Sequence, residues 1–150
     1  MGLDSFLSAK VFVGAEYEHR KVNGTIEIFA KGKRVDFGLK NLSELVYNVA
    51  YWRKANHIHK WFVDNTQNGE DDCRETYVSR EALEELLEAC NKVLNNKEAA
   101  EEVLPTESGF FFGSTEYDEY YYKDFEETVD MITKAIKDFP TASFYYKASW

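Results

Sequence analysis

Residues 51–63, Tyr51-Trp-Arg-Lys-Ala-Asn-His-Ile-His-Lys-Trp-Phe-Val63, place polar side chains where a core helix is usually apolar. On a 3.6-residue period, Asn56 falls on an apolar stripe. That stripe comprises Leu42, Leu45, Val49, Trp52 and Val63, with Arg53 and His59 at its margins. We therefore expect one long helix from a cap at Asn41 or Ser43 to about Asp64. A buried amide needs hydrogen-bond partners, so Asn56 either holds a neighbouring loop or faces a ligand.

Before this helix, the first forty residues show the alternating patterns of strands. Residues 10–18 and 25–29 read as an antiparallel pair, and Asn23-Gly24 between them is a strong type I′ hairpin signal. A third strand at 34–37 follows a tight turn at 31–33. These segments predict a three-stranded antiparallel meander.

The rest of the chain predicts two more main helices and a last strand. Ser79 is positioned to cap an amphipathic helix, a short helical piece spans 98–104, and residues 118–138 form the last helix. Residues 143–150 alternate like a strand that can add to the first sheet. The sequence thus predicts a single α+β domain over residues 1–150. It has an N-terminal antiparallel β-meander plus a C-terminal strand, packed against a bundle of three main helices.

The composition excludes some classes of partner. Eighteen Lys and Arg residues against 27 Asp and Glu residues give a formal net charge of -9, which argues against direct binding to duplex DNA. No signal peptide is evident and no apolar run is long enough to cross a bilayer, so we expect no membrane partner and a cytoplasmic location. Cys90 reads as a small core residue and Cys73 as a loop residue. Aromatic residues make up 16% of the chain, which favours interface or stacking surfaces.

Neither catalysis nor metal binding is strongly indicated by the motifs. His57 and His59 would point about 200° apart on a helix, so they cannot share one metal ion. We therefore expect no metal and no cofactor. A metal-dependent hydrolase using His59, Asp64 and the acidic residues between 116 and 119 is an alternative. Acidic residues also gather at helix N-termini because of the helix dipole, which is the simpler explanation for them.

A binding site assembled from aromatic and polar side chains is better supported. We expect the polar part of the long helix to approach the segment 109–121 and to form one pocket with it. Stacking faces and hydrogen-bonding groups would then meet, a combination that suits a nucleotide base with its phosphate. The expected ligand-binding residues are Trp52, Arg53, Asn56, His59, Phe111, Ser114, Thr115, Tyr117 and Tyr121. The alternative reading is an acidic surface over a tyrosine-rich core.

Three strings of the chain resemble a family of small proteins encoded by tailed phages and prophages. They are Tyr-Trp-Arg-Lys-Ala-Asn-x-Ile-His-x-Trp-Phe-Val at 51–63, Tyr-Val-Ser-Arg-Glu-x-Leu-Glu-Glu-Leu-Leu at 77–87 and Gly-Phe-Phe-Phe-Gly-Ser-Thr-x-Tyr-Asp-Glu-Tyr-Tyr at 109–121. The resemblance covers roughly residues 41–139 and transfers no catalytic residues. It implies a phage-derived protein that acts in the cytoplasm of an infected bacterium.

The resemblance and the residues together lead us to expect a phage accessory protein that binds rather than catalyses. It would antagonise host antiviral defence by sequestering a nucleotide-type signal, so its expected partner is a small nucleotide-like ligand or a host defence protein. The competing hypothesis is an acidic protein inhibitor or DNA mimic that blocks a host defence protein, which the negative charge supports. Aromatic and apolar residues cover the central helix nearly all round. This pattern also allows the chain to associate with itself as a homo-oligomer.

Overall fold

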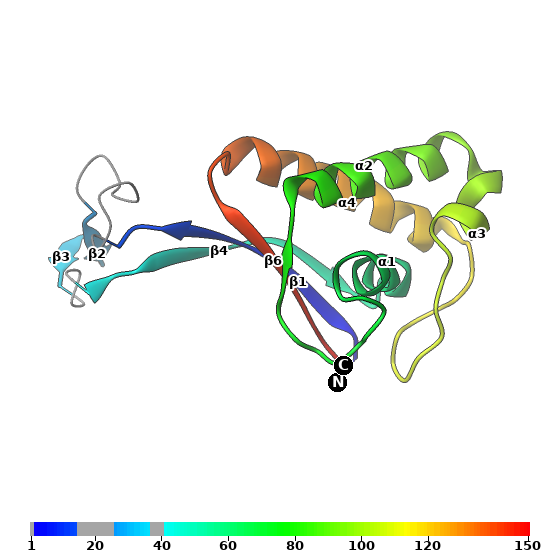
Figure 1. Ribbon diagram of the computed structural model, residues 1–150, viewed down its shortest axis with the longest axis horizontal. Coiled ribbons are helices and arrows are strands. Elements are labelled where there is room, and N and C mark those ends of the chain that lie inside the picture. Colours follow the sequence, from blue (N-terminus) through cyan, green and yellow to red (C-terminus); the bar gives the residue numbers. More distant parts are fainter. Residues whose placement is uncertain (1, 15–25, 37–40) are drawn as a thin grey trace.

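The structure is a computed structural model that describes residues 2–14, 26–36 and 41–150. Figure 1 shows how its helices and strands are arranged. The strands are β1 (Asp4–Phe12), β2 (Ile28–Ala30), β3 (Lys33–Val35), β4 (Glu44–Arg53), β5 (Thr76–Val78) and β6 (Ser143–Ser149). The helices are α1 (Asn56–Thr66), α2 (Arg80–Asn95), the 3-10 turn η3 (Lys97–Ala99), α3 (Ala100–Val103) and α4 (Glu119–Asp138). The predicted α+β class, with three main helices, is confirmed.

Strand β1 lies inside the main sheet, whose strand order is β4-β1-β6-β5 with every neighbouring pair antiparallel. The C-terminal strand β6 pairs with β1 from Ser149 opposite Asp4 to Ser143 opposite Lys10, which confirms that the last strand joins the first sheet. Strands β2 and β3 form a separate two-stranded sheet. In Figure 1, β1 and β4 run together away from the helices toward β2 and β3, and the two chain ends lie close together.

The prediction of one long helix from Asn41 or Ser43 to Asp64 is wrong. Its first half is the ten-residue strand β4, and only its second half is helical, as α1. Residues 44–53 are rich in Val, Tyr and Trp, which are side chains that favour strands. Lys54 then adopts a positive φ of 57°, which ends the strand, and α1 begins at Asn56.

A β-bulge explains why the sequence of β4 imitates a helix. The ladder with β1 passes from Leu7 opposite Ala50 to Ser8 opposite Asn48, so Val49 is an extra residue in β4. A bulge advances the in-and-out alternation of a strand by one position. Apolar residues on either side of the bulge therefore fall three or four residues apart, which is the spacing of a helical face.

The turn predicted at residues 31–33 is confirmed. Lys31 and Gly32 both have positive φ, 51° and 77°, as a type I′ turn between β2 and β3 requires. The predicted Asn23-Gly24 hairpin lies outside the described residues. The first strand was predicted to begin at residue 10, but β1 begins at Asp4.

Helices α2 and α4 confirm the two other predicted helices, and both begin at a side-chain cap. Ser79 Oγ accepts a hydrogen bond of 3.1 Å from the backbone N–H of Ala82, and Asp118 Oδ1 accepts from Tyr120 and Tyr121 at 3.0 and 3.1 Å. The carboxylate of Asp118 thus serves as a helix cap. Within the described ranges, no helix is long and apolar enough to cross a membrane.

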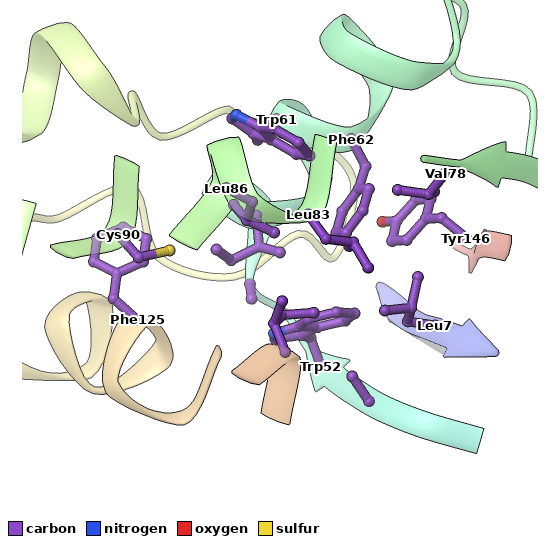
Figure 2. Close-up of a cluster of buried hydrophobic side chains, with 14 of the residues drawn as sticks. Leu7, Trp52, Trp61, Phe62, Val78, Leu83, Leu86, Cys90, Phe125 and Tyr146 are labelled. Atoms are coloured by element: carbon purple, nitrogen blue, oxygen red, sulfur yellow. The ribbon is translucent and has the colours of Figure 1, made fainter. Parts of the chain in front are cut away.

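One face of the main sheet packs against the helices and forms the core. Trp52, Phe144 and Tyr146 on this face are at most 4% exposed. Figure 2 shows Tyr146 beside Phe62 of α1, whose ring stacks on it with centroids 4.0 Å apart and planes 9° apart. The strand residues between these buried ones point to the opposite face of the sheet, where they are exposed or half-buried. We call that second surface the open face.

Candidate functional site

Asn56, the buried polar residue singled out from the sequence, holds a loop rather than facing a cavity. It is fully buried. Its Nδ2 donates to the carbonyl oxygens of Phe112 at 3.2 Å and Ser114 at 2.9 Å, and its Oδ1 accepts from the backbone N–H of Glu107 at 2.9 Å. Of the two roles considered for this amide, holding a neighbouring loop is the one observed.

Gly113 completes the attachment of the same loop. Its φ is 97°, and a Cβ atom placed on it would lie 2.9 Å from the carbonyl oxygen of Lys54. The loop backbone therefore approaches the turn before α1 more closely than a residue with a side chain allows. Together with the hydrogen bonds of Asn56, this contact fixes the segment 107–114 against the start of α1.

His59 lies in a second set of buried polar contacts. Its Nδ1 is 2.7 Å from the hydroxyl of Tyr146, which is in turn 3.0 Å from Ser5 Oγ. Its Nε2 is 2.8 Å from Asp71 Oδ2, and the other oxygen of Asp71 accepts from Trp150 Nε1 at 3.0 Å. Burial raises the pKa of Tyr146 well above its ordinary value, so this hydroxyl stays protonated. His59 is thus a satisfied structural histidine that joins β1, β6 and the loop after α1.

His57 has a different environment from His59. It is 4% exposed, and its ring packs against the rings of Tyr121 and Phe125, with centroids 4.6 and 4.9 Å away. Its Nε2 is 3.2 Å from Asp124 Oδ2, but neither ring nitrogen has a partner with hydrogen-bond geometry. The ring borders a cavity of about 80 Å³, which has room for about two or three water molecules and not for a nucleotide.

The other expected site residues are divided between the core and the surface. Trp52 is buried and its Nε1 donates to Thr128 Oγ1 at 2.8 Å. Tyr121 is also buried, and its hydroxyl donates to the carbonyl oxygen of Leu104 at 2.7 Å. Burial raises the pKa of Tyr121, so its hydroxyl remains a donor. Both side chains are therefore committed to packing.

The remaining expected residues are exposed at separate places. Arg53 ends β4 opposite Asp4. The loop residues Phe111, Ser114, Thr115 and Tyr117 are exposed, and it is Phe112 whose ring packs against His59, with centroids 5.4 Å apart. The structure thus brings Asn56 and His59 to the loop, as expected, but their polar atoms are occupied by protein groups there. This contact is a structural junction.

The open face of the sheet displays two pairs of aromatic side chains on neighbouring strands. Tyr51 of β4 lies opposite Phe6 of β1, with ring centroids 5.2 Å apart. Tyr77 of β5 lies opposite Tyr145 of β6, with centroids 5.8 Å apart. Phe6 is opposite Lys147, two residues from Tyr145, so Phe6 and Tyr145 are diagonal neighbours at roughly 7–8 Å. We call Tyr51, Phe6, Tyr145 and Tyr77 the aromatic band, which crosses all four strands.

The band is accessible and carries basic side chains. Phe6, Tyr51 and Tyr77 are 37%, 48% and 58% exposed. Lys10 lies over the ring of Tyr145 at 4.3 Å and forms an ion pair with Glu75. Lys147, which lies next to Phe6, forms no ion pair within the described part of the chain. The band therefore combines stacking surfaces with the positive charge of Lys147, and Tyr51 Oη donates a hydrogen bond to Asp4 on the same face.

These residues were missed by the sequence reasoning because they lie far apart in the chain. The alternation of residues 143–150 was recognised, and it could have shown that Tyr145 and Lys147 share a face. Only the strand pairing shows that Phe6, Tyr51 and Tyr77 join them there.

The acidic residues lie mainly on the helices instead. Many carboxylates of α2 and α4 are exposed, and these two helices pack against each other. They are Glu81, Glu84, Glu85 and Glu88 on α2, and Glu119, Glu126, Glu127 and Asp130 on α4. Among the described residues, no three His, Cys, Asp or Glu side chains are grouped so that they could hold a metal ion. The residues named for a hydrolase are therefore dispersed: His59 contacts Asp71, and Asp64 pairs with Lys60.

No protein family model, no curated protein and no solved structure matches this chain.

Proposed function

We propose that this protein binds rather than catalyses, and that it is a phage accessory protein which antagonises host antiviral defence by sequestering a nucleotide-type signal. The aromatic band on the open face is the observation that carries the proposal. The proposed ligand class is the one expected from the sequence, but the proposed binding site is the surface of the sheet and not the loop junction at Asn56.

The chemistry of the band supports a ligand with bases and phosphates. Stacking of a base on an aromatic side chain contributes about 1–3 kcal/mol by alanine substitution. Lys147 beside Phe6 supplies a charge for a phosphate, and Lys10 lies over Tyr145. A band of four rings on a sheet surface suits a ligand with more than one base better than a mononucleotide, because a single base would leave most rings in water. Dinucleotide-type signals and short single strands share this chemistry.

A binding titration tests the proposal. The probes are a fluorescent cyclic dinucleotide and a short oligothymidylate, added to the full chain and followed by anisotropy. Phe6→Ala and Lys147→Ala are expected to weaken binding about tenfold each. Tyr120→Ala is the control, because Tyr120 is 71% exposed on α4, away from the sheet. If neither probe binds, or if Phe6→Ala binds as tightly as the wild type, the proposal fails.

The exposed carboxylates of α2 and α4 favour a second candidate function, an acidic inhibitor or DNA mimic that blocks a host defence protein. Its binding would depend on charge, would weaken steeply with salt, and would be insensitive to changes in the aromatic band. Reversing Glu84 and Glu88 to Lys would then abolish inhibition of a basic nuclease, whereas Phe6→Ala would leave it unchanged. The opposite pattern would favour the band.

A further inference from the structure

Strand β4 is a long edge strand with apolar side chains in solvent. In the described part of the chain it pairs only with β1, so its other backbone edge is open over ten residues. Val46, Tyr47 and Tyr51 are 55%, 41% and 48% exposed along it. Natural proteins usually blunt such an edge with inward-pointing charges, proline or a covering segment, because an open apolar edge pairs with another strand.

A groove follows the same edge on the helix side of the sheet. Its volume is about 520 Å³, and β4 forms one wall and α4 the other. Val49 and Met131 give it an apolar lining, while Lys134 and Asp138 lie at the α4 side. A groove between an edge strand and a helix is the usual setting for strand addition, in which backbone hydrogen bonds bind and side-chain pockets select.

We propose that this edge pairs with β4 of a second copy of the chain, antiparallel and about a two-fold axis between Asn48 and Val49. In that register Glu44 lies opposite Arg53 of the second copy, and Arg53 opposite its Glu44. Glu44 and Arg53 are the two end residues of β4, and both are exposed. The two-fold symmetry creates two Glu44–Arg53 pairs in each dimer. The strand is thus complementary in charge to itself.

The side chains between these ends also match in this register. Val46 would face Tyr51 of the second copy on the open face, a β-branched residue against an aromatic one, which is a favourable cross-strand pair. Tyr47 would face Ala50 on the helix side, a large side chain against a small one. The bulge places these residues so that each partner points to the same side of the sheet.

Dimerisation would join two four-stranded sheets into one of eight strands. The groove beside α4 would then be closed by the second copy's β4, and the edge would be removed from solvent. This inference does not depend on the ligand proposed for the aromatic band.

Charge reversal tests the pairing with the full chain. The oligomeric state is measured by sedimentation velocity and by native mass spectrometry over a range of concentrations. Arg53→Glu and Glu44→Arg each place like charges opposite one another twice, and each is expected to weaken the dimer about tenfold. The double variant Glu44→Arg/Arg53→Glu restores opposite charges and should recover wild-type association. Glu85→Arg, an equivalent reversal on exposed α2, should have no effect.

A disulfide cross-link tests the register itself. In the chain carrying Val46→Cys and Tyr51→Cys, the two thiols lie five positions apart on one strand, about 16 Å, and cannot join within a copy. In the proposed register they lie opposite each other between copies, so mild oxidation should give a covalent dimer. Either cysteine alone should not. A chain that stays monomeric at about 100 µM, a dimer that ignores both charge reversals, or a double-cysteine variant that does not cross-link would overturn the proposal.

Discussion

Helix α1 buries Asn56, His57 and His59 at the centre of the molecule, whereas the open face exposes Phe6 and Tyr77 to solvent. This is the reverse of the usual distribution of polar and aromatic side chains. The polar atoms of Asn56 and His59 are paired with protein groups, so these residues act in folding. The aromatic rings have water on one side, and this leaves them available for a ligand. The contrast shows that the rarity of a residue at its position does not by itself mark a binding site, because Asn56 and His59 are rare there and yet fully paired.

Among the changes to the buried polar residues, Asn56→Leu is expected to have the largest effect on stability. The change leaves two carbonyl groups and the N–H of Glu107 without partners, and we expect the free energy of unfolding to fall by about 3 kcal/mol. Urea denaturation followed by circular dichroism measures it. Asn91→Leu on the exposed side of α2 is the control and should change stability by less than about 0.5 kcal/mol. A neutral result for Asn56→Leu would mean that the loop is not held by this amide.

Gly113→Ala addresses the same loop through its backbone. The substitution combines the cost of a positive φ with a close contact to the carbonyl oxygen of Lys54, so we expect a loss of about 2 kcal/mol. Gly69→Ala is the matched control, because Gly69 has a φ of 75° but open space around its Cβ position. It should cost only about 1 kcal/mol. Equal losses in thermal or urea melts would show that the close approach at Gly113 is unimportant.

Cys90 lies buried in the core, so the folded protein should resist forming its thiolate. Stability at alkaline pH tests this expectation. Burial raises the pKa of the Cys90 thiol from 9.0 to about 12. Above pH 9 the unfolded chain therefore loses a proton that the folded chain keeps, and stability falls as the pH rises. At pH 10 this thiol should reduce stability by about 1.4 kcal/mol. Urea melts from pH 8 to pH 10 should show a shallower decline for Cys90→Ala than for the wild type. Parallel declines would indicate that the thiol is not shielded.

Tyr77→Ser probes the exposed side of the contrast and should have the smallest effect on folding. Tyr77 is 58% exposed and its main contact is the ring of Tyr145, so stability should change by about 0.5 kcal/mol or less. A loss above about 2 kcal/mol in urea melts would place this ring in the core rather than at a binding surface.

Local patterns in the sequence predicted the elements that depend on local physics. The cap at Ser79 and the regular apolar stripes predicted α2 and α4, and alternation predicted β6. The strand β4 was missed because its bulge at Val49 disturbs the alternation that identifies a strand. Burial of Asn56 was predicted from periodicity, although the supposed helix did not extend back to residue 41.

The arrangement of surfaces could not be predicted in the same way. The aromatic band unites residues 6, 51, 77 and 145, which become neighbours only through pairing between distant strands. The partner of Asn56 lies in a loop more than fifty residues away. Neither relation leaves a periodic trace in one sequence, because the contacts depend on register and not on spacing along the chain.

The first turn of α1 has a consequence for how the molecule opens. Asn56 and His59 lie three residues apart, and they hold the segment 107–114 and Asp71 respectively. Opening of that single turn would release both segments at once, so their backbone amides should exchange with deuterium at similar rates and gain protection together during refolding. The two segments would thus behave as one cooperative unit in time, although more than thirty residues of chain, including all of α2, separate them.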